Sequence, residues 1–229
     1  AFQLFVDVGS AERQPWYRTN RIAAEFNLLY RWHPLVPTDC EVDAVPVPNT
    51  EFRFNNTFLT ERGVAKLVAC ASAQRAGKVT IGNTAHFLVA AELGAAEKSR
   101  KWKLRSYNDY RDRFGLPRVK TFLDLTEDKE AAAALASVYR HVDDVELLTG
   151  LLAESRGDDV VFGALMTLMV GSDAFSQALT NPLLSTALFN RDTFSQAGLD
   201  SILATSTLDQ VAQRNAKMGG QRACFGVAR

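Results

Sequence analysis

Apolar residues recur at the three- and four-residue spacing of an α-helix through most of the chain, and loops rich in proline, asparagine and aspartate separate these segments. Residues at this spacing share one face of a helix, so the pattern predicts helices that pack through an apolar stripe. We therefore expect a mainly α fold, with helices at 16–30, 60–71, 84–99, 107–114, 127–139, 145–154, 160–170 and 206–215.

Two of the expected elements carry more specific predictions. Residues 84–99 combine phenylalanine, leucine and alanine on all sides, which predicts a long buried helix. Residues 51–54 alternate between polar and apolar side chains within an irregular stretch at 38–56, and this alternation predicts a small strand.

The charge balance excludes one large class of function. The 229 residues carry 26 Lys and Arg against 26 Asp and Glu, so the formal net charge is zero. Electrostatic binding to nucleic acid needs an excess of cations that displaces counterions from phosphate, and no such excess exists here. No apolar run approaches the roughly 18–20 residues that cross a bilayer. The chain opens on Ala1 inside an apolar phrase, so we expect it to be cut from a larger protein.

Three histidines are present, and one of them has a tyrosine three positions before it. On a helix, the side chains of Tyr30 and His33 would lie on the same face and could point into one pocket. Imidazole is a standard axial ligand of haem iron, and a phenol beside an oxidised haem can become a radical. This spacing alone is common, however, and a purely structural role for both residues stays open at this point.

The sequence around this pair is more informative about family than the Tyr-His spacing is. Residues 17–37, which read YRTNRIAAEFNLLYRWHPLVP, closely resemble a segment of prostaglandin synthases and of fungal and bacterial fatty-acid dioxygenases. The likeness continues in order through 52–59, 98–104, the phrase SYNDYRDRFG at 106–115, DDVEL at 143–147, VFG at 161–163 and 181–194. It covers roughly residues 17–215, and it identifies the chain as similar to the animal haem peroxidase superfamily.

The resemblance implies that 1–229 is the C-terminal part of a haem peroxidase or dioxygenase catalytic domain. It implies haem b as cofactor, with His33 as the axial ligand of the iron and Tyr30 as a radical carrier. The expected chemistry has two stages: peroxide oxidises the haem, and the tyrosyl radical then takes hydrogen from an unsaturated fatty acid, to which O2 adds. A membrane-binding part upstream and a homodimer are compatible with the resemblance.

The chain departs from the family pattern in several places. The family's distal haem residues lie upstream of the Tyr30 segment and are not among these 229 residues, so the upstream, distal half of the pocket is absent. The asparagine partner that ordinary peroxidases of the superfamily give their axial histidine is also missing, and Asn27 does not replace it. Leu148 stands where the family often has a tyrosine. Within Gly171–Ser176, aligning the Phe-Ser pair places Ser176 at the serine of the family's fatty-acid channel, whereas counting from the glycine without a gap places Phe175 there.

Three alternatives stay open. The chain could belong to a plain haem peroxidase that oxidises small phenols or halides, to a catalytically incomplete fragment, or to a silent helical binding module. His86 and His141 match no haem ligand of the family, and we expect both to be ordinary packed histidines.

Overall fold

The computed structural model describes residues 22–157, 159–179, 181, 183, 185 and 187–225. The fold is mainly helical, as expected from the apolar periodicity. Its contacts divide the chain into two units, one formed by 22–36 with 78–184 and the other by 37–77 with 185–225. Among the described residues, no helix combines the length and the apolar character needed to cross a membrane.

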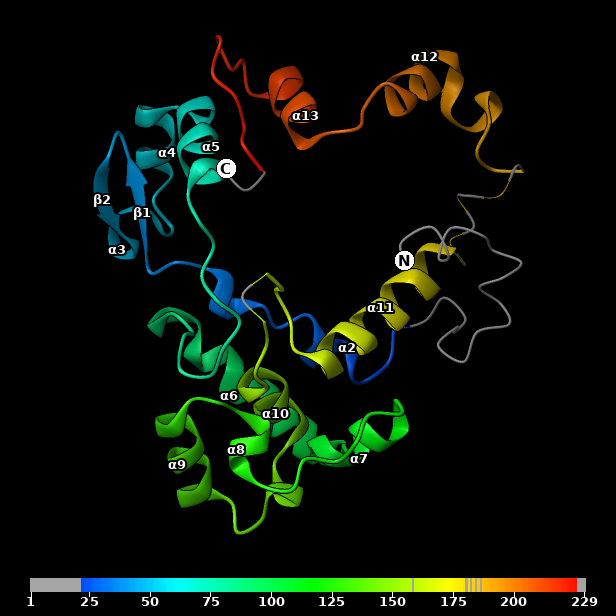
Figure 1. The fold of residues 1–229 in the computed structure, drawn as a ribbon. Helices are drawn as coiled ribbons and strands as arrows, with labels where there is room; N and C mark the ends of the chain where they lie inside the picture. Colours follow the sequence, from blue (N-terminus) through cyan, green and yellow to red (C-terminus); the bar gives the residue numbers. More distant parts are fainter. Residues whose placement is uncertain are drawn as a thin grey trace. The chain divides into compact units, whose positions relative to one another are not determined.

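The first unit, whose main helices are labelled in Figure 1, holds the buried apolar cluster. Its elements are α2 (Phe26–Leu29), η2 (His33–Leu35), η3 (His86–Leu88), α6 (Val89–Lys101), α7 (Tyr107–Arg113), α8 (Phe122–Leu125), α9 (Lys129–Val138), η4 (Val142–Asp144), α10 (Leu147–Ala153) and α11 (Ala164–Leu179). Fully buried side chains of α2, α7, α10 and α11 meet in one cluster, which includes Leu28, Tyr107, Leu151 and Leu165. Burial of these apolar groups is the main force that holds the helices together.

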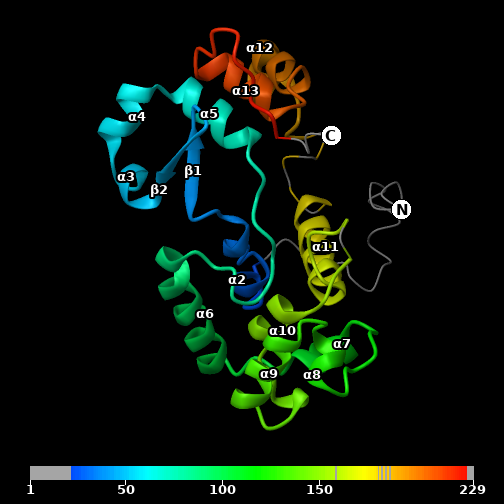
Figure 2. The same cartoon turned by 60° about the vertical axis from the view of Figure 1, so that its left-hand side comes forward.

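The second unit contains the only described sheet, which is a two-stranded antiparallel hairpin (Figure 2). Strands β1 (Asp39–Val42) and β2 (Val45–Pro48) are followed by the helices α3 (Asn49–Phe52), α4 (Asn56–Arg62) and α5 (Val64–Ala73). The same unit holds α12 (Arg191–Leu203) and α13 (Leu208–Asn215). Gly63, at φ +83°, separates α4 from α5, a backbone conformation that glycine adopts without steric cost.

The strand expected at 51–54 is wrong, because 49–52 form helix α3 and the strands lie just upstream. Pro46 and Pro48 made that upstream stretch look like a loop. In a two-stranded hairpin each strand has one unpaired edge, so a residue without an N–H is tolerated there.

Two helix predictions also need correction. Within the described part of 16–30, only Phe26–Leu29 is α-helical, and residues before 22 lie outside the described range. The helix expected at 84–99 begins as the short η3 and continues as α6. Its buried residues are Ala95 and Ser99, whereas Leu93 is 61% exposed. Apolar composition on all sides therefore did not bury this helix.

The phrases that carry the family likeness meet in the first unit. The backbone N–H of Tyr107, from SYNDYRDRFG, donates to the carbonyl of Val145, from DDVEL, at 2.8 Å. Arg100 forms a two-pronged ion pair with Glu146 at 2.6 and 2.9 Å, and Tyr139 donates to the same carboxylate at 3.1 Å. The Tyr107–Val145 bond therefore joins the start of α7 to the segment before α10, and Glu146 connects the start of α10 to α6 and to the end of α9.

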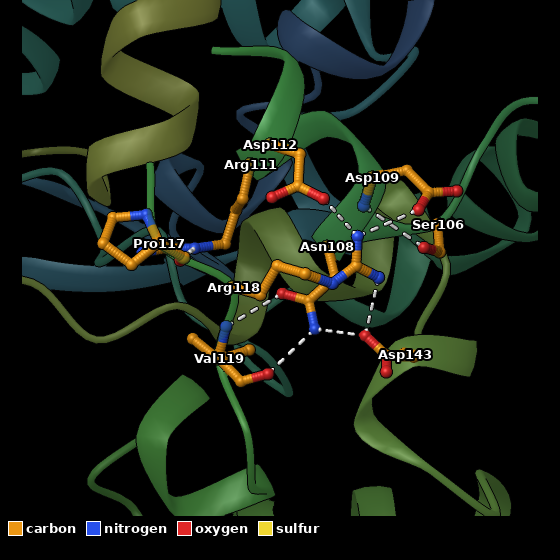
Figure 3. Close-up of polar contacts among 9 residues, drawn as sticks. All are labelled: Ser106, Asn108, Asp109, Arg111, Asp112, Pro117, Arg118, Val119 and Asp143. Carbon is orange, nitrogen blue, oxygen red and sulfur yellow. Dashed lines mark hydrogen bonds and ion pairs between the residues drawn. The ribbon is translucent and has the colours of Figure 1, made fainter. Parts of the chain in front are cut away.

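A buried asparagine secures the loop after α7 (Figure 3). The Asn108 amide nitrogen donates to the Val119 carbonyl at 2.9 Å and to Asp143 at 2.7 Å, while its oxygen accepts from the Val119 N–H at 3.0 Å. Arg118 lies beside this amide and pairs with three carboxylates, those of Asp109, Asp112 and Asp143. The Arg118 guanidinium, followed by the Asn108 amide, holds the pKa of Asp143 below its usual value. Every polar atom of the Asn108 side chain is thus satisfied inside the core.

Helix α10 packs against α7 through a glycine. A Cβ atom at Gly150 would lie far inside van der Waals contact with the Tyr107 ring, which is fully buried. By contrast, a Cβ at Gly94, in the middle of α6, would meet nothing within 4 Å.

These two glycines predict opposite effects of the same substitution. Gly150→Ala should lower the free energy of unfolding by about 1–3 kcal/mol, because the ring or the helix must shift. Gly94→Ala should raise it by roughly 0.5–1 kcal/mol, because alanine loses less backbone entropy in a helix. Urea denaturation of both variants measures the difference. Equal effects of the two changes would contradict the close packing of α10 on α7.

Candidate functional site

The predicted pair Tyr30 and His33 lies where two short helical elements meet. Helix α2 ends at Leu29, and Tyr30 is its capping residue. His33 begins η2, with Pro34 next to it in the first turn, where the missing N–H of proline costs no hydrogen bond. The expectation that both residues share one face of a continuous helix is therefore wrong.

A tryptophan side chain explains why the helix stops. The indole N–H of Trp32 donates to the carbonyl of Leu29 at 2.7 Å. In a continued α-helix this carbonyl would accept from the backbone N–H of His33. The indole takes its place, and the chain can turn while the carbonyl stays satisfied. Trp32 also packs against the core, which is an ordinary structural role for a tryptophan.

His33 contacts a carboxylate of a distant helix. Its Nδ1 lies 2.7 Å from Oε1 of Glu92, which stands in the first turn of α6 and 59 residues away in the sequence. The two side chains are 24% and 14% exposed. Among the described residues, no hydrogen-bond partner is found for the other ring nitrogen, Nε2. His33 therefore offers one nitrogen with which it could bind a metal.

Tyr30 contacts a different carboxylate. Its hydroxyl donates to Oδ2 of Asp173, in α11, at 3.0 Å, and the Gln177 amide donates to the same oxygen at 2.8 Å. Burial, followed by this hydrogen bond and the Asp173 charge, raises the pKa of Tyr30 to about 12. The phenol is thus held in its protonated form, with a proton acceptor already in contact.

Aromatic rings surround the Tyr30 phenol. Ring centroids of Phe26 and Trp32 lie 4.5 and 5.2 Å from that of Tyr30, and the Trp32 ring lies 4.9 Å from that of Phe162. Such tilted contacts stabilise aromatic pairs beyond the area they bury. They fix the orientation of the phenol between α2 and the start of α11.

The third predicted residue, Ser176, lies in α11 with only 1% of its surface exposed. It follows Asp173 by three positions, so both are on the face of α11 that faces α2. Its place in a substrate channel stays a prediction.

The remaining candidates have structural surroundings. Arg31 donates to the backbone and side-chain oxygens of Asn27 at 2.9 and 3.0 Å. His86 and His141 are exposed, which corrects the expectation that both are packed. Leu148 is buried in the core.

Sequence reasoning missed both carboxylates of the site. Asp173 lies within the Gly171–Ser176 phrase, whose resemblance to the family concerns the serine and not the aspartate. Glu92 lies on a helix that was expected to be buried and apolar. A carboxylate 59 or 143 residues from its partner leaves no local signal, because only the tertiary fold brings the two together.

The Tyr30–Asp173 contact predicts a change in acidity. Asp173→Asn removes the negative charge and should lower the pKa of Tyr30 from about 12 towards, but not to, its ordinary value, because burial remains the larger cause. A fluorinated tyrosine placed at position 30 shifts the titration into an accessible range, where phenolate absorbance follows it. Glu97→Gln, an exposed change on α6, is the control. An unchanged titration in Asp173→Asn would contradict the contact.

Comparisons with known proteins show which family the chain is similar to. The family described as animal haem peroxidase matches residues 20–225. Prostaglandin G/H synthase 2 of Equus caballus is 37% identical over 186 residues, which are 80% of this chain and 31% of that protein. Prostaglandin G/H synthase 1 of Mus musculus is 34% identical over 216 residues, or 94% of this chain and 36% of that protein. The chain thus spans about a third of the length of these relatives.

Solved structures show the same fold at lower identity. Fatty acid alpha-dioxygenase of Oryza sativa matches with a TM-score of 0.76 and 21% identity, covering 86% of this chain and 38% of that one. Peroxidase A of Dictyostelium discoideum matches with a TM-score of 0.69 and 19% identity, covering 96% and 45%. Because the family profile extends over nearly all of the sequence, the chain belongs to the animal haem peroxidase family.

Proposed function

We propose that this chain forms the His33 side of the haem pocket in a fatty-acid dioxygenase that also has peroxidase activity. The observation that carries the proposal is the pair of contacts His33–Glu92 and Tyr30–Asp173. Together they present an imidazole with a free nitrogen and a phenol with a proton acceptor, two parts that such a reaction requires.

Haem b fits the residues present. A porphyrin supplies four nitrogens to its iron, so a single nitrogen ligand from this part of the protein would suffice to hold it here. His33 Nε2 is the nitrogen that would bind, because Nδ1 is engaged by Glu92. When bound, the haem supplies the one-electron oxidation that peroxide drives.

Tyr30 is the residue that passes this oxidation to the substrate. A phenol that loses an electron becomes a strong acid, so its proton must leave at the same time. Asp173 Oδ2, at 3.0 Å from the hydroxyl, is placed to accept that proton. The neutral tyrosyl radical then abstracts hydrogen from an unsaturated fatty acid, and O2 adds to the carbon radical. The rings of Phe26 and Trp32 pack against the phenol ring and hold its orientation.

The substrate class rests on the relatives and on α11. The relatives include prostaglandin G/H synthases, and a solved structure of the same fold is a fatty acid alpha-dioxygenase with palmitic acid. Ser176, on the same face of α11 as Asp173, is the residue we assign to the fatty-acid channel.

A plain haem peroxidase is the second candidate. Peroxidase A of Dictyostelium discoideum covers 96% of this chain, a larger share than the dioxygenase structures do. In that case His33 keeps its role and Tyr30 has no part in turnover. The two candidate functions therefore differ in whether Tyr30 takes part in the reaction.

The axial ligand is tested by haem binding. His33→Ala should weaken binding of haem b by more than the roughly 10- to 100-fold that loss of an outer partner causes, because the ligand itself is removed. It should also abolish the Soret band typical of imidazole ligation. His86→Ala, which removes an exposed histidine, should leave both unchanged. A His33→Ala protein that binds haem as the wild type does would overturn the assignment.

The role of Tyr30 is tested by oxygen uptake. Tyr30→Phe should abolish linoleate-dependent oxygen consumption while peroxide consumption continues, since only the second stage needs the phenol. Tyr139→Phe is the matched control, because Tyr139 also donates its hydroxyl to a carboxylate, that of Glu146. Oxygen uptake that survives in Tyr30→Phe would reject the dioxygenase in favour of the plain peroxidase.

A further inference from the structure

The contact between His33 and Glu92 has a defined direction. A carboxylate accepts hydrogen bonds and donates none, so the proton between the two atoms, 2.7 Å apart, belongs to Nδ1 of the imidazole. The neutral ring then carries its lone pair on Nε2. Glu92 therefore selects the tautomer of His33, and it does so from another helix.

Glu92 is not fully paired where it stands. Its side chain is 14% exposed, and its second oxygen, Oε2, is buried without a hydrogen-bond partner among the described residues. Leaving such an atom unsatisfied destabilises a fold, and buried groups of this kind call for an explanation. With no second donor to share its charge, the carboxylate directs its negative charge to the imidazole.

The backbone around His33 is held independently of Glu92. The N–H groups of Leu35 and Val36 donate to the carbonyls of Trp32 and His33, both at 2.9 Å. The Asn83 amide donates to the carbonyl of Pro34 at 3.0 Å. Glu92 therefore orients the ring of His33, while other residues place its backbone.

We propose that Glu92 is a positioning residue for His33 that fixes Nε2 as the iron-binding nitrogen and gives the imidazole anionic character. The inference rests on the function proposed above, in which His33 binds haem. An imidazole with anionic character is a stronger electron donor, so it stabilises the oxidised form of a bound iron. Ordinary peroxidases of the family use an asparagine as the hydrogen-bond partner of the axial histidine, and this chain lacks that asparagine. Asn27 does not replace it, because its side-chain oxygen accepts from Arg31. Glu92 thereby supplies the missing partner of His33.

Two substitutions separate the two parts of this role. Glu92→Gln keeps an oxygen that can accept from Nδ1 but removes the charge. In the haem-loaded protein it should shift the iron–histidine stretching band of the ferrous form to lower frequency and raise the reduction potential, with haem affinity nearly unchanged. Glu92→Ala also removes the acceptor, so it should in addition weaken haem binding about 10- to 100-fold. Resonance Raman spectroscopy, redox titration and haem titration measure the three effects.

Glu97→Gln and Glu97→Ala are the matched controls. Glu97 is an exposed glutamate on the same helix α6, and its loss removes the same charge without touching His33. Both control variants should retain the wild-type band, potential and affinity.

The outcomes distinguish this inference from the function on which it rests. If Glu92→Gln behaves like Glu97→Gln while His33→Ala loses the iron–histidine band, the role of Glu92 is refuted and ligation by His33 stands. If His33→Ala retains the band, ligation and the role of Glu92 both fall. Should Glu92→Ala not fold, the band position and potential of Glu92→Gln decide alone, because that variant keeps the shape and an acceptor.

Discussion

The carboxylate of Glu154 connects the elements that place the candidate site. One of its oxygens accepts from Arg111, in α7, at 2.7 Å, and the other accepts from the backbone N–H of Leu165, at the start of α11, at 3.0 Å. The pair is nearly buried, with side chains 7% and 12% exposed. Removing one partner of a buried ion pair costs about 3–5 kcal/mol, since the other charge stays without compensation. Helix α11 therefore starts at a defined point, and Asp173 meets Tyr30 further along it.

A glycine makes that arrangement sterically possible. A Cβ at Gly163 would lie in close conflict with the Glu154 carboxylate. Only a residue without a side chain lets the carboxylate approach the first turn of α11, where it also satisfies a backbone donor that no helix can satisfy internally. The phrase VFG at 161–163 contributes this glycine, and its phenylalanine packs on Trp32. The same phrase thus supports both the start of α11 and the aromatic cluster around Tyr30.

The segments that resemble the family have mainly structural contacts in this chain. Asn108 and Arg111, from SYNDYRDRFG, bind the loop after α7 and the Glu154 carboxylate, and Glu146, from DDVEL, holds Arg100 and Tyr139. Another residue of that phrase, Tyr110, donates to Glu25 at 2.6 Å, which ties α7 to the start of α2. The likeness over 17–215 thus consists mainly of residues that hold the scaffold together. Only Tyr30, His33 and Ser176 are site residues that the resemblance implies.

Local sequence determined where most helices form, because apolar spacing and capping residues act over a few positions. The ends of α7, α9 and α13 lie close to the expected ones, and Asp128 and Thr207 cap two of them. Sequence also singled out Tyr30 and His33. The tertiary structure alone decided how the two side chains are oriented. The Trp32 indole binds the Leu29 carbonyl and α2 ends at Leu29, so Tyr30 and His33 do not share a helix face. It also supplied their partners, Asp173 and Glu92, from helices 143 and 59 residues away. A hydrogen bond over such a separation depends on the packing of whole helices, and no pattern within a short window encodes it.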